Sequence, residues 1–534
     1  MSRLTHGQML SLCKSASVRA RVLRTVRLVT LAILALCFTG CSSSNNGTVD
    51  SFSATGGSTG TGGLAATGGN TGTGGTTATG GITGTGGTAG TGGVVDLCDM
   101  PVPSDDGCTP PSPPSANDSV TVEMAAPCGA PSYRASGFIY GIAADGSQPP
   151  NSLLSDIKVT HLRCGGAQMG CPNGGYVNGQ YDARWNAVKA YYAKAKAIGG
   201  TLLILVHDIW GADAVCNVPR WPGQNGDWSE YTSFIAQLIS DAKANGMTGP
   251  DVRWELWNEP DYGAFWGASQ DQWLEMWKRG YQQIRAALPD AIIEGPSLAS
   301  GVGGWFNTFL DYVQANDVVP DYMGWHEAGG GGDPVNDANN ARAAMMSRSL
   351  SAMGLDISEY GSGSEQNPGH SAWFIARLER ADVDGLRSNW GGGNGLYSTM
   401  GGLVTGNWEP TSQYWVYKRY ADQTGARSTV TEGTQIDAVA YQDAGQAKAI
   451  ILVGNRGGTT GSVNVLIKHV PSWLQQTGSG TTKVVVERMP DGNSAVAAPT
   501  IVSSTDVDLT CQQLNVTIDW SNAKDAYAIT LTPL

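Results

Sequence analysis

Residues 252–261 read Val-Arg-Trp-Glu-Leu-Trp-Asn-Glu-Pro-Asp. An apolar run with the composition of a β-strand, 252–257, passes directly into the polar segment Asn-Glu-Pro-Asp. A stretch with helical periodicity, 270–288, follows. This part of the chain therefore predicts one strand–helix unit with polar residues at the carboxyl end of its strand.

The same unit recurs on both sides of this stretch. Strand-like runs are predicted at 137–142, 159–164, 202–207, 252–257, 291–295, 322–326, 355–359 and 385–390. Helices are predicted at 185–198, 231–244, 270–288, 305–315, 338–353, 372–381 and 413–422. Eight units favour an α/β fold, a closed (β/α)8 TIM barrel over residues 132–426. A doubly wound sheet is the alternative.

The segments outside the barrel have other compositions. Residues 427–534 lose the helical period and show short strand-like runs between turn residues, which predicts a C-terminal β-sandwich. Residues 119–124 alternate like a strand, and we expect them to join that sheet. Residues 41–95 are rich in Gly and Thr and predict a flexible tether, and residues 96–131 form a segment rich in Cys and Pro.

The N-terminus predicts an export signal. Residues 1–40 contain six cations and no acid, with an apolar run at 28–38 that is too short to cross a membrane. The run ends at Phe38-Thr39-Gly40-Cys41, which resembles a bacterial lipoprotein signal with Cys41 as the lipidated residue. We therefore expect an exported lipoprotein at the cell envelope or cell surface, held to the membrane by its N-terminal lipid. An ordinary secretory signal is the alternative.

Composition and motifs exclude several classes of function. The chain carries 33 Lys and Arg against 46 Asp and Glu, a net charge of −13, which argues against nucleic acid as a partner. It contains no His-Glu-x-x-His, no Cys-x-x-Cys and no phosphate-binding loop. Its Asp-rich segments lack the ligand spacing of a known calcium loop. No metal and no cofactor are therefore predicted.

Two glutamates stand at the carboxyl ends of predicted barrel strands, where the active site of such a barrel lies. Glu259 ends the fourth strand and Glu359 ends the seventh, and these strands face each other across the barrel mouth. Two carboxyl groups placed there can approach to about 5 Å, the separation used for double displacement at a sugar anomeric carbon. Glu255, inside the fourth strand, is interpreted as a buried partner of Arg163 or Arg253.

The motif Trp-Asn-Glu-Pro at 257–260, with a second Glu ending strand seven, resembles clan A of the retaining glycoside hydrolases. The longer run that begins at Trp254, with its trailing β-domain, most resembles glycoside hydrolase family 39, whose members include β-xylosidases. The resemblance implies that Glu259 is the acid/base and that Glu359 is the nucleophile. It also implies that Asn258 binds the sugar 2-hydroxyl.

The resemblance covers about residues 132–534 and implies further substrate-binding residues. Arg163 ends strand two, where clan members carry an Arg that supports the nucleophile. His207 and His326 end strands three and six and are predicted partners of sugar or carboxyl groups. Trp390 ends strand eight and resembles the Trp that forms the floor of the sugar subsite.

Strand six departs from the clan pattern. Clan members often place a Tyr two residues after the His of this strand, but here the order is His326-Glu327-Ala328. Either another residue takes that role or the role is absent, and Glu327 adds a carboxylate near the mouth. Substrate preference is the property that this departure leaves least defined.

Cysteine positions predict a disulfide at the rim of the barrel. Cys171 and Cys216 fall in the loops after strands two and three, which are neighbours at the mouth. Two further pairs are interpreted as Cys98–Cys108 and Cys128–Cys511. Cys164 then remains as a buried free thiol.

These observations predict a retaining glycoside hydrolase that cleaves O-glycosidic bonds of hemicellulose or related cell-wall glycans. The expected partner is an oligo- or polysaccharide substrate. Two other functions stay open. One is a non-catalytic surface lipoprotein that binds glycan, and the other is a transglycosylase that uses the same carboxylates.

Overall fold

The computed structural model of the chain describes residues 108, 112–170, 173–212, 218–329, 332–389 and 399–534. Four predictions concern other residues: the export signal with Cys41, the tether, the Cys171–Cys216 disulfide and the subsite Trp390. They lie outside the described residues. Within the described part of the chain, no helix combines the length and the apolar character needed to cross a membrane.

Eight parallel strands close into the predicted barrel, in the order β2 to β9 around the ring. They are β2 Gly137–Ile139, β3 His161–Cys164, β4 Thr201–Leu205, β5 Val252–Glu255, β6 Ile292–Leu298, β7 Tyr322–Glu327, β8 Gly354–Tyr360 and β9 Asp384–Arg387. The first and last strands pair with each other, Gly137 beside Leu386, which closes the ring. The predicted fold class is therefore confirmed.

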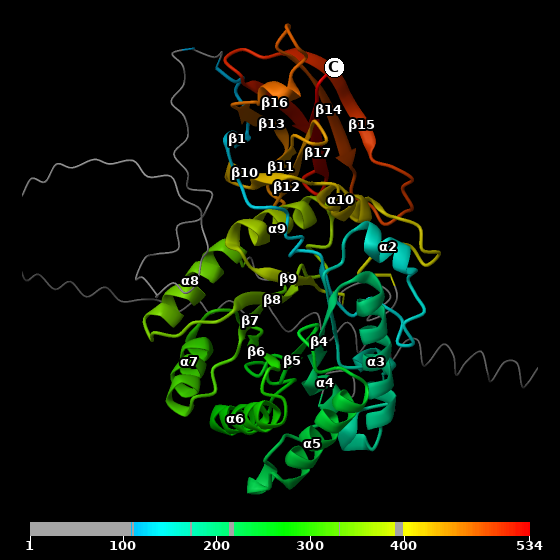
Figure 1. The fold of residues 1–534 in the computed structure, drawn as a ribbon, viewed down its shortest axis with the longest axis vertical. Helices are drawn as coiled ribbons and strands as arrows, with labels where there is room; N and C mark the ends of the chain where they lie inside the picture. The colour runs from blue at the N-terminus through cyan, green and yellow to red at the C-terminus, as the bar shows by residue number, and fades with distance from the viewer. Residues whose placement is uncertain (1–107, 109–111, 171–172, 213–217, 330–331, 390–398) are drawn as a thin grey trace, which may run out of the picture. The chain divides into compact units, whose positions relative to one another are not determined.

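Helices follow the strands (Figure 1). They are α2 Asn151–Asp156, α3 Tyr181–Ile198, α4 Val206–Trp210, α5 Ser229–Ala244, α6 Gln270–Ala287, α7 Gly304–Asn316, α8 Pro334–Met346, α9 Pro368–Ala381 and α10 Ser412–Ala421. The third predicted strand, 202–207, corresponds to β4. Its predicted end was wrong, because the chain turns into α4 at Val206. The predicted strand had included Val206 and His207.

Alternation along β5 explains how the barrel is filled. Val252 and Trp254 point toward the helices and are buried in the apolar core, whereas Arg253 and Glu255 point into the barrel. Inside, Arg253 donates to Asp356 at 3.4 Å and to Asp384 at 2.9 Å. The barrel interior therefore contains a network of buried charges, and such charges are tolerated only when they are paired.

The remaining strands form one sheet with nine strands, ordered β15-β14-β17-β12-β11-β10-β1-β13-β16. They are β1 Asp118–Cys128, β10 Ala426–Thr431, β11 Ile436–Asp443, β12 Lys448–Asn455, β13 Gly461–Lys468, β14 Thr481–Met489, β15 Thr500–Asp508, β16 Leu514–Trp520 and β17 Ala526–Thr532. Val465 of β13 and Val486 of β14 come from opposite ends of this order yet lie in one core, so the sheet folds over itself as the expected sandwich. As predicted, the strand before the barrel joins this sheet.

Helix α9 joins the barrel to the sheet (Figure 1). Its residues pack against β11 and β12, and Gly454 of β12 lies so close to the backbone of Trp373 that a Cβ atom there would clash. Arg377 and Arg380 of α9 both pair with Asp437 of β11. This contact is therefore both close-packed and ionic.

The cysteine pairing differs from two of the predictions. Cys108 bonds to Cys511, which lies in the turn between β15 and β16, so the pairs Cys98–Cys108 and Cys128–Cys511 were wrong. Cys128 is also disulfide-bonded. Cys164 is a buried free thiol, as predicted, and burial raises its pKa to about 12. A thiol in this state is a poor nucleophile.

Candidate active site

Glu259 stands four residues beyond the end of β5, and its backbone is held in place from a neighbouring strand. Its φ of 43° lies in the left-handed region, which is uncommon for a residue with a side chain. The Glu259 amide donates to the carbonyl of Ser297 at 2.9 Å. Asp261 accepts the amides of Ala299 and Ser300, each at 2.9 Å. These bonds to the β6 end stabilise the unusual conformation and fix where the Glu259 side chain begins.

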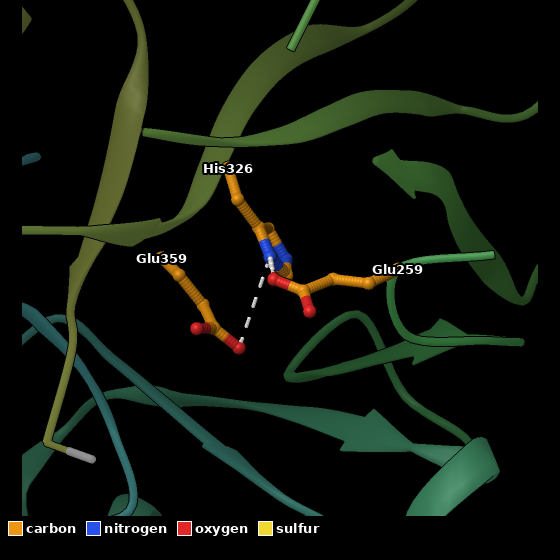
Figure 2. A group of neighbouring side chains, drawn as sticks. All are labelled: Glu259, His326 and Glu359. Atoms are coloured by element: carbon orange, nitrogen blue, oxygen red, sulfur yellow. Dashed lines mark hydrogen bonds and ion pairs between the residues drawn. The ribbon is translucent and has the colours of Figure 1, made fainter. Parts of the chain in front are cut away.

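Three side chains from three strand ends converge at the mouth (Figure 2). His326 of β7 lies between the two carboxylates, with Nδ1 2.8 Å from Glu259 Oε1 and 3.9 Å from Glu359 Oε1. One oxygen of each glutamate and the imidazole nitrogen all lie within 4.8 Å of one another. The sequence placed these three residues at one end of the barrel, and the structure brings them into one cluster.

Arg163 of β3 connects the nucleophile candidate to the barrel interior. Its Nη1 donates to Glu359 Oε1 at 2.6 Å, and its Nη2 donates to Asn258 Oδ1 at 2.6 Å. Nε donates to Glu255 Oε2, and Nη2 also donates to Glu255 Oε1 at 2.7 Å. Arg163 is fully buried. Glu255 is therefore the buried partner of Arg163, which was one of the two alternatives, and it offsets much of the cost of burying that cation.

The charge of His326 is set by its two carboxylate neighbours. Burial lowers its pKa, but the attraction of Glu359 and the hydrogen bond and charge of Glu259 outweigh burial, so the pKa is raised above its ordinary 6.5. Nδ1 then carries a proton that it donates to Glu259. Among the described residues, Nε2 has no hydrogen-bond partner.

His207 is not part of this cluster. It is fully buried at the start of α4, and both ring nitrogens meet acceptors: Asp208 Oδ1 at 2.7 Å and the Ala212 carbonyl at 3.1 Å. Tyr140 donates to the other oxygen of Asp208. These contacts leave neither nitrogen to a sugar, so the structure gives His207 a supporting role instead of the predicted role in substrate binding.

Glu327 faces away from the cluster. On an extended strand it shares a face with Trp325, whose indole donates to Glu327 Oε1 at 3.1 Å, whereas His326 points to the opposite face. Burial and the nearby Asp337 raise the pKa of Glu327 to about 8. Near neutral pH, Glu327 is therefore a protonated acid, and it packs toward α8.

Sequence reasoning missed the side chains that hold His207 and the Glu259 segment in place. Tyr140 and Asp208 were not singled out, because an isolated Tyr and Asp carry no motif. Asp261 belongs to the quoted Asn-Glu-Pro-Asp segment, and its position two residues after Glu259 was the one available signal. Trp257 is buried, and its ring centroid lies 4.5 Å from that of His207.

Comparisons with known proteins agree with this geometry. The family model described as Glycosyl hydrolases family 39 matches residues 224–352, a segment that includes Glu259 and His326. A curated relative, the 3-O-alpha-D-galactosyl-alpha-L-arabinofuranosidase of Bifidobacterium longum subsp. longum, is 23% identical over 451 residues, which is 74% of this chain and 39% of the relative. The chain thus spans well under half the length of that relative.

Two solved structures share the fold. N2152 from Neocallimastix frontalis aligns with a TM-score of 0.65 and 25% identity, covering 78% of this chain and 100% of that one. A monomeric beta-xylosidase from Caulobacter crescentus CB15 aligns with a TM-score of 0.53 and 15% identity, covering 78% and 99%. Together with the converging carboxylates, the family model and the curated relative support a clan A glycoside hydrolase that resembles family 39.

Proposed function

We propose that the chain hydrolyses O-glycosidic bonds with retention of anomeric configuration. The observation that carries this proposal is the approach of Glu259 and Glu359, which have oxygens within 4.8 Å of each other. Retaining enzymes hold their two carboxyl groups about 5–5.5 Å apart, whereas inverting enzymes separate them by about 6.5–9.5 Å to admit a water. The spacing here favours direct attack by one carboxylate.

In the first step, a Glu359 oxygen bonds to the anomeric carbon while the bond from that carbon to the leaving oxygen breaks. Glu259 gives its proton to the leaving oxygen, so the leaving group departs as a neutral alcohol. In the second step, the Glu259 carboxylate takes a proton from water, the water oxygen bonds to the anomeric carbon, and Glu359 is released. Two inversions give net retention.

Three neighbouring residues prepare the pair for these steps. Arg163 and His326 carry positive charge beside Glu359, which stabilises its carboxylate and orients the attacking oxygen. The His326 Nδ1 proton, shared with Glu259 Oε1, is positioned next to the group that must act as an acid. Asn258 has its amide oxygen bound to Arg163, so the amide nitrogen is the group that would donate to the sugar 2-hydroxyl.

We propose a β-xylosidase-like substrate class, hemicellulose fragments or related cell-wall glycans. The solved beta-xylosidase with the same fold supports this choice. A specific observation also favours arabinofuranosides, because the curated relative is named as a 3-O-alpha-D-galactosyl-alpha-L-arabinofuranosidase. Trp390 remains a proposed subsite residue on the basis of the sequence. Export as a lipid-anchored protein through Cys41 is likewise proposed from the sequence.

The test is hydrolysis of a panel of aryl β-xylosides, aryl α-L-arabinofuranosides and cell-wall polysaccharides by the full chain. Wild type should release product from at least one class, and Glu259→Gln and Glu359→Gln should each lose it. The Glu259 variant should keep more activity on aryl glycosides with acidic phenol leaving groups, because these need no proton. Glycan binding without turnover would favour the non-catalytic alternative, and dominant transfer to sugar acceptors would favour the transglycosylase.

A further inference from the structure

The trio at the barrel mouth has the donor set of a transition-metal site (Figure 2). We propose that Glu259, His326 and Glu359 bind Zn²⁺ and that the bound ion inhibits turnover reversibly. The inhibitory part rests on the proposed function, whereas the binding part does not. The donors come from three separate strand ends, so no contiguous metal-binding motif marks them in the sequence.

The spacing of the donors suits a small cation. With bonds of about 2.0–2.2 Å, the ligand atoms of a tetrahedral zinc site stand roughly 3.3–3.6 Å apart. His326 Nδ1 lies 2.8 Å from one carboxylate oxygen and 3.9 Å from the other, and all three donors lie within 4.8 Å of one another. Small rotations of the two glutamates would bring all three donors to bonding distance, and a water can take the fourth position.

A metal binds the deprotonated imidazole, so the ion would take the place of the proton that His326 Nδ1 shares with Glu259. Arg163 contacts Glu359, but Glu255 holds two of its nitrogens and largely cancels its charge. Two carboxylates and one imidazole then remain at the mouth. The Glu259 side chain is 14% exposed, against 6% for Glu359 and 1% for His326, so an ion can enter from the Glu259 side.

The chemistry of the three donor atoms favours Zn²⁺ over Mg²⁺ and Ca²⁺. Imidazole nitrogen suits Zn²⁺, whereas Mg²⁺ and Ca²⁺ prefer oxygen and need about six to eight ligands. Elsewhere in the part of the chain that the structure describes, no other group of three such residues lies within ligand distance. His469 and Glu123 of the sandwich form a matched pair, with Nδ1 2.7 Å from one carboxylate oxygen. That pair supplies the control, because the described residues place no third donor of this kind within ligand distance of it.

Zinc at this position would occupy the oxygens that attack the anomeric carbon and that move the proton. Metal and substrate therefore compete for the same two carboxylates. Inhibition should be competitive, reversed by EDTA, and absent with Mg²⁺ at the same concentration.

Titration calorimetry of the full chain with zinc chloride tests the binding. Wild type and the Glu123→Gln control should bind one Zn²⁺ with equal affinity, whereas Glu259→Gln and Glu359→Gln should bind at least tenfold more weakly. Thermal unfolding checks that each variant folds, and Zn²⁺ should raise the melting temperature only of the two proteins that bind it. Undiminished binding in either glutamine variant, or no binding by wild type, overturns the site.

Kinetics with and without Zn²⁺ separate the two proposals. If no substrate is turned over but zinc binds as described, the site stands and the proposed function fails. If the enzyme is active and zinc binds without competing with substrate, the inhibitory role is overturned.

Discussion

The Nδ1 atom of His326 lies 2.8 Å from Oε1 of Glu259. This bond links Glu259, four residues beyond the end of β5, to strand β7. It places a proton beside the proposed acid/base while His326 also lies within 3.9 Å of Glu359. His326 is therefore a positioning residue for both carboxylates, and its removal should affect both steps of the reaction.

His326→Asn should lower kcat/KM about 100-fold, the scale expected when a reacting group is displaced by about 1 Å. The pKa of His326 is raised above 6.5, because its two carboxylate neighbours outweigh burial. The wild type therefore keeps the imidazolium proton to a higher pH than an ordinary histidine does and loses it as the pH rises further, which should produce an alkaline fall in activity. The variant should lack this fall. His469→Asn, the same change at the other His–Glu pair, should leave the profile unchanged. If His326→Asn showed the same fall in activity at alkaline pH as wild type, this role would be contradicted.

Arg163→Lys should reduce kcat about 100-fold and destabilise the fold by about 2 kcal/mol. A lysine keeps the positive charge but cannot hold Glu255, Glu359 and Asn258 at the same time, as the planar guanidinium does. The matched control is Arg253→Lys, another buried arginine inside the barrel, which binds Asp356 and Asp384. It should lose comparable stability in chemical denaturation with a much smaller loss of kcat. Equal losses of kcat would mean that Arg163 serves only the fold.

Glu327→Gln should stabilise the protein at pH 7, in contrast to most buried substitutions. The pKa of Glu327 is raised from 4.5 to about 8, mainly by burial. Between these values the folded state holds a proton that the unfolded state has lost, so stability is full below pH 4.5 and falls as the pH rises through 8. Glutamine cannot ionise, and the gain at pH 7 should be on the order of 3 kcal/mol.

The pH dependence of unfolding by urea measures this effect. Glu327→Gln should show a flatter dependence than wild type between pH 4.5 and 8. Glu409→Gln, at an exposed glutamate, should run parallel to wild type. A Glu327→Gln protein that is less stable at pH 7 would show that the acid is ionised in the folded state.

Much of the barrel could be predicted because its strands are short apolar runs with polar residues at one end. Because Glu259 and Glu359 follow or end two such runs, now β5 and β8, both could be assigned to opposite sides of the mouth without any knowledge of packing. Glu255 could be recognised as buried because it lies inside an apolar strand, where a charge requires a partner. Its choice of Arg163 over Arg253 needed the structure, since both arginines point into the barrel.

The errors have physical causes. Leu205, Val206 and His207 continue an apolar run, so periodicity could not show that the strand ends and α4 begins inside it. The partner of Cys511 depends on how the chain before β1 runs along the sheet, and sequence spacing does not determine such long-range pairing.

The most direct test of the proposed retaining pair is to trap the covalent intermediate. The full chain would be incubated with the 2-deoxy-2-fluoro glycoside that corresponds to its best substrate, and the digested protein analysed by mass spectrometry. The electronegative fluorine slows release of the sugar from the nucleophile. We predict one sugar per chain, on the peptide that contains Glu359, and no label on Glu359→Gln. Label on the peptide of another carboxylate, or a product of inverted configuration without any label, would contradict the assignment of Glu359 as nucleophile.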